Sequence, residues 1–192
     1  MKKQELALSI LFAALTAVGA QITIPTTPVP FTLQTFFILL AGLVGGPRVG
    51  FLSIIIYLLM GAVGLPVFAN LRGGWDVFLG PTGGYLVAFP LAAASAGLIY
   101  RRVGLGKLHA AALGAAGAEA LIYLIGVPWL AAWLSFSRGL STLDGLSQAA
   151  TLGMIPFLIW DAVKALLAIY VSTRKQVVHA VTRYLGAATP LP

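Results

Sequence analysis

Six apolar segments, separated by short loops, constrain the fold of this chain more than any other feature. Of its 192 residues, 59% are hydrophobic and only 9% are charged, whereas an ordinary soluble domain has about 25% charged residues. A helix that crosses a bilayer needs about 20 mostly apolar residues. The sequence therefore predicts a single-domain (1–192), all-α integral membrane protein with six transmembrane helices. The six predicted spans are residues 6–22, 31–45, 49–63, 85–100, 108–126 and 153–172.

Some of these spans are expected to be short or broken. Segments 31–45 and 49–63 are short for a full crossing and are joined by a tight turn at Gly46-Pro47. Non-helical backbone at membrane depth is tolerated only where protein buries it or where it lines a cavity. Lys2 and Lys3 before the first segment resemble the start of a signal peptide. We expect that segment to be retained as the first span.

Lysine and arginine residues set the expected orientation. If the N-terminus is cytoplasmic, only Arg72 and Arg138 of the twelve Lys and Arg residues lie outside, and Lys164 lies within the membrane. The others lie inside, as the positive-inside rule requires. Both termini are therefore predicted to be cytoplasmic. The net charge of +7 is interpreted as this bias and not as a nucleic-acid surface.

The predicted outer loops are unusually apolar. Loops 23–30 and 64–84 are rich in proline, glycine and hydrophobic residues. In water these loops would expose an apolar patch, which usually marks a binding site or an aggregation risk. We expect them to fold over a ligand that enters from outside, although flexibility of glycine-rich loops is the alternative. The third loop, 127–151, is predicted to hold a short interfacial helix with aromatic anchors. The tail after Arg174 is expected to be a frayed cytoplasmic end.

Two charged residues interrupt the last apolar segment. Asp161 and Lys164 are three positions apart, so their side chains share one helix face. A charge at the bilayer centre costs about 2.5–3.5 kcal/mol on insertion scales, and such residues usually face a cavity or a partner. The pair predicts a polar site within the membrane, with a purely structural ion pair as the alternative. Glu119 is either a protonated or paired carboxylate or a part of the same site.

No pattern in the chain indicates catalysis. The sequence has no His-Glu-x-x-His zinc motif and no Gly-x-Ser-x-Gly elbow. The absence of cysteine excludes thiol metal sites. We expect no catalytic residue, no metal and no cofactor, and energy for any transport must come from elsewhere. Ala13 and Ala17 have the spacing of small residues that pack helices closely, either internally or against a partner.

A series of motifs resembles the biotin-specific substrate-binding subunits of energy-coupling factor transporters, the BioY family. The resemblance covers about residues 5–172 in order. The motifs are Pro28–Phe36, Ala41–Gly50, Tyr57–Ala69, Gly80–Leu86, Ile122-Tyr123 with Gly126 and Trp129-Leu130, and Asp161-x-x-Lys164.

The resemblance implies six helices and capture of biotin from outside a prokaryotic cell, across whose plasma membrane the chain passes several times. It also implies partnership with a transmembrane scaffold subunit and two ATPases, although some family members are reported to act alone. Carried over by motif position, the biotin contacts would be Asn70, Asp161 and Lys164, and the pocket would be lined by Tyr85 and Gln34. Ala13 and Ala17 would form the scaffold-docking strip.

The chain departs from the family pattern at three positions. Trp160 stands where a glycine usually precedes the aspartate, and Asp76 and Glu119 also look atypical. The function that we expect is therefore biotin binding for uptake, without catalysis by this chain. The alternatives are a self-sufficient, ion-coupled carrier of a small molecule and an intramembrane enzyme that uses Asp161 or Glu119 as an acid or base.

Overall fold

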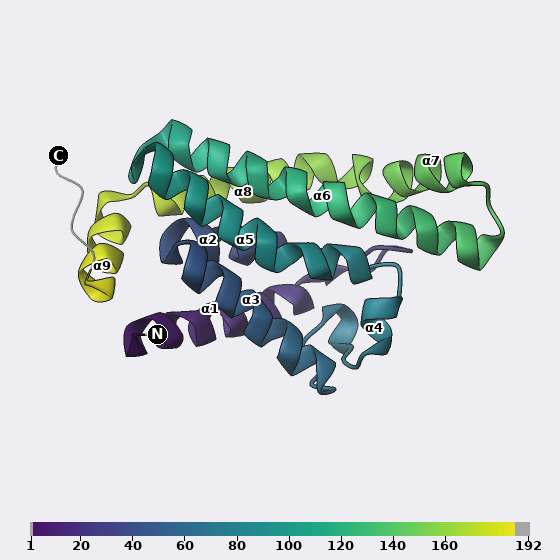
Figure 1. Cartoon of the computed structure of the whole chain (residues 1–192), viewed down its shortest axis with the longest axis horizontal. Helices are drawn as coiled ribbons and strands as arrows, with labels where there is room; N and C mark the ends of the chain where they lie inside the picture. Colours follow the sequence, from purple (N-terminus) through teal and green to yellow (C-terminus); the bar gives the residue numbers. More distant parts are fainter. Residues whose placement is uncertain (1, 187–192) are drawn as a thin grey trace.

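Long helices lie side by side along most of the molecule (Figure 1). The structure is a computed structural model that describes residues 2–186. The main helices are α1 (Lys3–Gln21), α2 (Gln34–Gly45), α3 (Pro47–Ala62), α5 (Gly83–Gly104), α6 (Leu108–Arg138), α7 (Thr142–Gly153) and α8 (Leu158–Ser172). Within the described residues, α1, α5, α6 and the stretch Thr142–Ser172 are each long and apolar enough to cross a membrane, and α2 and α3 are shorter apolar helices.

Short elements complete the fold and connect these helices. A two-stranded antiparallel ribbon interrupts the first loop, which departs slightly from the all-α prediction. Two short helices occupy the second loop, and one joins α7 to α8. These elements are β1 (Thr23–Ile24), β2 (Phe31–Thr32), η1 (Ala69–Leu71), α4 (Asp76–Leu79) and η2 (Ile155–Phe157).

Small residues let the short helix α2 pack closely against α5. A Cβ atom at Gly42 would lie 2.1 Å from the carbonyl oxygen of Ala93, and one at Gly97 would lie 2.5 Å from the carbonyl oxygen of Gly42. Only glycine permits this approach of two backbones, as is common where helices pack in lipid. Arg101 of α5 stabilises the α2–α3 turn by donating to the carbonyl of Gly45 at 3.0 Å. The packing holds the start of α2 in the interior.

The prediction of a third outer loop at 127–151 is wrong. Helix α6 continues through Pro128 to Arg138, and α7 begins only four residues later. The continuation is stabilised by packing, because Leu130 and Leu134 are fully buried. A proline inside a helix removes one backbone hydrogen bond, and burial of this apolar face offsets that loss.

The tail after Arg174 also differs from its prediction as a frayed end. Residues Lys175–Leu185 form helix α9, which turns Thr182 and Leu185 into the protein. The ammonium of Lys2 donates to the carbonyl of Leu185 at 3.3 Å. Both described ends of the chain therefore lie together. The last six positions, 187–192, are outside the described residues.

Helix α1 turns Ala13, one of the two residues of the predicted docking strip, towards the interior. Ala13 is 1% exposed and belongs to the main hydrophobic core, against which Ala17 also packs. Internal packing, the alternative use of this spacing, therefore accounts for the pair. The outward face of the helix instead carries Ala7, Leu11, Ala14 and Val18.

A tryptophan scan of two adjacent positions tests this placement. Ala13→Trp should lower the midpoint of thermal unfolding in detergent, because overpacking a core costs about 1–3 kcal/mol or more. Ala14→Trp carries the same side chain on the exposed face and should unfold near the wild-type temperature. Equal midpoints for the two variants would show that Ala13 does not face the core.

Candidate functional site

A cavity of about 230 Å³ lies where the first two loops meet the buried ends of the helices. Its walls come from the first loop, the start of α2, the η1 region, the start of α5, the middle of α6 and the start of α8. The fold brings together here all five residues that were predicted to contact or surround a ligand. They are Gln34, Asn70, Tyr85, Asp161 and Lys164.

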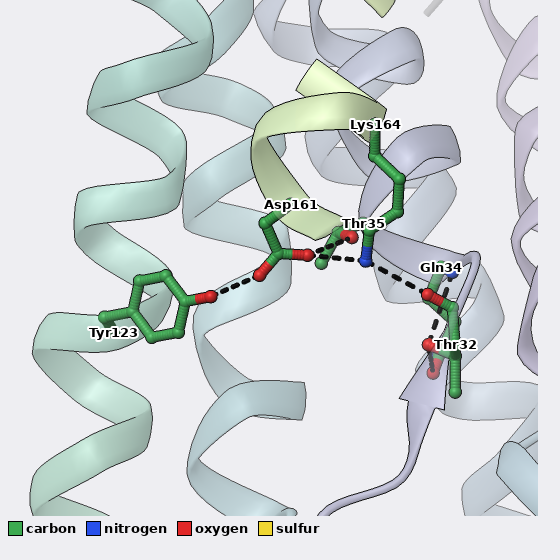
Figure 2. A network of polar contacts seen from close by, with 6 residues as sticks. All are labelled: Thr32, Gln34, Thr35, Tyr123, Asp161 and Lys164. Atoms are coloured by element: carbon green, nitrogen blue, oxygen red, sulfur yellow. Dashed lines mark hydrogen bonds and ion pairs between the residues drawn. The ribbon is translucent and has the colours of Figure 1, made fainter. Parts of the chain in front are cut away.

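The charged pair lies at the inner wall of this cavity. The ammonium of Lys164 is 2.5 Å from Oδ1 of Asp161. The Lys164 side chain is 10% exposed and the Asp161 side chain is 7% exposed. Two further donors reach the carboxylate from opposite sides (Figure 2). Thr35 of α2 donates to Oδ1 at 3.1 Å, and the hydroxyl of Tyr123 on α6 donates to Oδ2. Asp161 thus joins three helices at one point.

Lys164 extends the network towards the first loop. Its ammonium also donates to the carbonyl of Thr32 at 3.1 Å. The hydroxyl of Thr32 donates to the side-chain oxygen of Gln34 at 2.9 Å. The side-chain nitrogen Nε2 of Gln34 donates to the hydroxyl of Tyr57 at 2.7 Å. Figure 2 shows this chain of contacts running from Tyr123 through the ion pair to Gln34. Gln34 is thereby held within the network.

The ion pair keeps unused hydrogen-bonding capacity. An ammonium has three donors and a carboxylate has about four acceptor positions. Lys164 uses two donors, on Asp161 and Thr32. Asp161 accepts from Lys164, Thr35 and Tyr123. One donor of Lys164 therefore remains, together with one acceptor position on Oδ2 of Asp161, the oxygen that accepts only from Tyr123.

Tyr85 forms a wall of the cavity. Its hydroxyl donates to the carbonyl of Gly153 at 2.8 Å, so the donor is already engaged. Its ring rests on Gly126, where a Cβ atom would lie 2.4 Å from the ring. The absence of side chains at Gly126 and Gly153 therefore makes room for the ring between α6 and the end of α7.

Asn70 lies at the exposed mouth of the cavity. Its backbone is left-handed (φ 60°), a conformation that asparagine adopts more readily than most residues. The loop around it is held by Gln21, which donates to the carbonyl of Phe68 and accepts from the amide of Leu71, both at 3.1 Å. Among the described residues, no hydrogen bond engages the Asn70 side chain, so its amide is available to a ligand.

The apolar part of the wall comes from both of the loops that were expected to cover a ligand. Pro28 and Val29 contribute from the first loop, and Phe68 and Val77 from the second. Phe157 also lines the cavity and stacks on Phe31 with ring centroids 4.0 Å apart. The loops thus lie at the cavity. Their action as a lid stays a prediction.

Sequence reasoning missed four members of the polar network, namely Thr32, Thr35, Tyr57 and Tyr123. Thr32 and Thr35 flank Gln34 but look like ordinary polar residues at a helix start. Tyr123 belongs to one of the recognised motifs. It lies on α6 and Asp161 lies on α8, so the sequence does not reveal that the two side chains meet. A polar residue in an apolar segment was the available signal for Thr35 and Tyr123, but threonine and tyrosine are common enough in membrane helices that the signal is weak.

Two of the three atypical positions do not alter the inner part of the cavity. Trp160 is 56% exposed on the outer surface and does not line the cavity. Asp76 forms an exposed ion pair with Arg72 at 2.9 Å, at the mouth. The departure from the family pattern at Trp160 therefore does not change the residues that line the cavity.

Comparisons with known proteins identify the family of this chain. The model of the BioY family matches residues 1–182 of the chain. The chain belongs to the BioY family. A relative from Pyrococcus horikoshii, described as a probable biotin transporter BioY, is 48% identical over 92% of this chain and 98% of its own length. The biotin transporter BioY of Thermotoga maritima is 41% identical, over 85% and 90% of the two chains.

A solved structure shares the fold of this BioY-family chain. It is described as the S-component for biotin from an ECF-type ABC transporter, and it superposes with a TM-score of 0.67 at 28% sequence identity. The match covers 92% of this chain and 94% of the other. The arrangement of helices around the cavity is therefore that of a transporter substrate-binding component.

A double-mutant cycle tests whether the two charges depend on one another. Lys164→Met leaves a buried carboxylate without its counter-ion and should destabilise the ligand-free protein by about 3–5 kcal/mol. Adding Asp161→Asn removes that charge and keeps one acceptor oxygen for Thr35 or Tyr123, while the other hydroxyl can rotate to accept from the amide NH2 group. The double variant should therefore recover much of the lost stability in thermal unfolding. Additive losses in the double variant would show that the two side chains do not interact.

Proposed function

We propose that this chain is the membrane-embedded, biotin-binding subunit of an energy-coupling factor transporter, and that it captures biotin from outside the cell. The observation that carries the proposal is the buried Asp161–Lys164 pair, which keeps a free donor and a free acceptor inside an apolar cavity. Relatives that cover nearly the whole chain are named as biotin transporters. Membership of this transporter family argues against the enzyme alternative.

The chemistry of biotin suits the two unused positions of the pair. Its ureido ring presents two N–H donors and one carbonyl acceptor, which is the complement of a carboxylate beside an ammonium. We assign one ureido N–H to Asp161 and the ureido carbonyl to Lys164. Charge-assisted hydrogen bonds of this kind are roughly twice as strong as neutral ones.

The remaining parts of biotin match the rest of the cavity. Its sulfur-containing ring is apolar and would lie against Phe68, Phe157 and the Tyr85 ring. Its carboxylate tail would then point to the mouth, where the Asn70 amide is free and Arg72 lines the rim. A site with apolar walls and a few convergent polar groups is typical of small-molecule binding.

Removal of either charge should weaken biotin binding strongly. Asp161→Asn and Lys164→Ala each leave the other charge buried without its partner, at about 3–5 kcal/mol. Each variant also lacks one of the two charge-assisted hydrogen bonds to the ureido group, which contribute about 1.5–3 kcal/mol each, so affinity should drop by about ten- to a hundredfold. Calorimetric titration of the purified variants with biotin measures the change. Asp144→Asn, which alters an exposed carboxylate on α7, is the control and should bind normally; normal affinity in both site variants would leave the pair with a structural role.

We further propose six membrane crossings in a prokaryotic plasma membrane, with both termini cytoplasmic. The N-terminus, the α2–α3 turn, the α5–α6 turn and α9 lie at one end of the molecule, on the left of Figure 1. These segments carry nearly all of the lysine and arginine residues. The mouth of the cavity lies towards the other end, so the positive-inside rule makes it the outer side.

Labelling from outside tests this orientation. The native chain has no cysteine, so single introduced thiols have no background. A cysteine in place of Arg138, at the end of α6, should react with a membrane-impermeant reagent added to intact cells. A cysteine in place of Lys107, in the α5–α6 turn, should react only after the cells are opened. The reverse pattern would place the cavity mouth on the cytoplasmic side.

We propose that uptake requires a transmembrane scaffold subunit and two ATPases. The solved relative is described as one component of an ECF-type ABC transporter, and this chain has no recognised ATP-binding motif of its own. The outward face of α1 is the docking surface that we assign, in place of Ala13 and Ala17. Its small residues, Ala7 and Ala14, allow another helix to approach closely.

A bulky residue on this face should separate assembly from binding. Ala14→Trp should abolish co-purification with the scaffold and ATPase subunits, because the indole forces the helices apart. The biotin affinity of the isolated chain should stay unchanged, since the cavity lies elsewhere. Val87→Trp, on the exposed side of α5, is the matched control and should leave assembly intact. Normal assembly of Ala14→Trp would exclude this face of α1.

A further inference from the structure

Glu119 is a buried acidic residue that the proposed binding site does not use. It lies on α6, four positions before Tyr123. Both of its carboxyl oxygens are buried, and neither has a hydrogen-bond partner among the described residues. Buried polar groups without partners are rare in native proteins, and each one calls for a physical explanation.

The packing of α6 against α8 places Glu119 just beneath the ion pair. The two helices run in opposite directions (Figure 1), and Tyr123 meets Asp161. Glu119 lies one turn before Tyr123 on α6, and Lys164 lies one turn after Asp161 on α8. Glu119 and Lys164 therefore lie at the same level. Asp161 and Lys164 are the two charged groups that act electrostatically on the Glu119 carboxyl.

Other elements that pack against α6 bring no further charge to this level. Helix α2 has no titratable residue, and the one on α7, Asp144, is in its first turn at the far end. Helix α5 carries Tyr85 beside the cavity, and its remaining titratable residues, Tyr100, Arg101 and Arg102, are near its opposite end. The local charge is therefore set by two carboxyl groups and one ammonium.

The net charge of these three groups makes the ionisation of Glu119 depend on what fills the cavity. With both carboxyls ionised, the cluster carries one net negative charge, which is tolerated only if water screens it. A ligand that expels water from the cavity removes that screening. Biotin also brings a carboxylate of its own. Both effects disfavour the ionised form of Glu119, and neither depends on which end of biotin meets the pair.

We propose that Glu119 is a proton-binding site coupled to occupancy of the cavity. At a pH high enough to ionise this buried carboxyl in the empty protein, one proton passes from solvent to the Glu119 carboxylate when biotin binds and forms the neutral acid; when biotin leaves, the proton is released. This inference rests on the proposed function, since biotin is the ligand. Glu119 does not line the cavity, so it acts through the charge of the cluster and not by contact.

The coupling has a defined sign. Because the bound state holds more protons than the free state, biotin affinity should fall as pH rises through the range in which Glu119 of the empty protein ionises. For one proton, the dissociation constant rises by up to about tenfold per pH unit. Glu119→Gln cannot ionise and should bind biotin with an affinity that does not change over the same range.

Calorimetry of the purified chain in buffers of different ionisation enthalpy measures this proton directly. Within the pH range in which Glu119 of the empty protein ionises, wild-type protein and the control Asp144→Asn should take up protons on binding biotin, and Glu119→Gln should take up none. If the glutamine variant does not fold, Glu119→Leu removes the same carboxyl from an apolar helix. No proton uptake by the wild type, proton release, or uptake that persists without Glu119 would each overturn the proposal. Absence of any biotin binding by the wild type would instead overturn the proposed function.

Discussion

A charged pair buried in a membrane helix persists only if the surrounding protein satisfies it, and in this chain the fold is arranged to do so. Breaking such a pair costs about 3–5 kcal/mol, because the remaining charge is left in a medium that cannot solvate it. Asp161 receives hydrogen bonds from α2 and α6, and Lys164 donates to the carbonyl that precedes α2. The pair therefore fixes α8 against two other helices and also forms the inner wall of the cavity.

The close helix packing serves the same arrangement. Thr35 can reach Asp161 only because α2 begins inside the molecule, and α2 holds that position through the glycine contact between Gly42 and Ala93. Gly126 likewise leaves room for the ring of Tyr85 beside the cavity. Glycine thus lets the helix backbones approach closely. The polar side chains of the site can form their contacts only at these short separations between helices.

Much of the site could be predicted from the sequence, but its supporting contacts could not. A charged pair in an apolar segment is a strong signal, so Asp161 and Lys164 were found directly, and the motif resemblance added Gln34, Asn70 and Tyr85. The extent of α6 was missed because Pro128 and the small residues around it resemble a loop, while the burial of Leu130 and Leu134 that stabilises the helix comes from tertiary contacts. The sequence left two uses of Ala13 open, because small-residue spacing indicates close packing without indicating which helix is packed.

The central claim is that biotin occupies the cavity with its ureido group on the Asp161–Lys164 pair. An experimental structure of the purified chain with bound biotin tests this most directly. The ureido carbonyl should lie within hydrogen-bond distance of the Lys164 ammonium, a ureido N–H should donate to Asp161, and the carboxylate tail should point towards Asn70. Biotin bound with its carboxylate at Lys164, or bound outside this cavity, would contradict it.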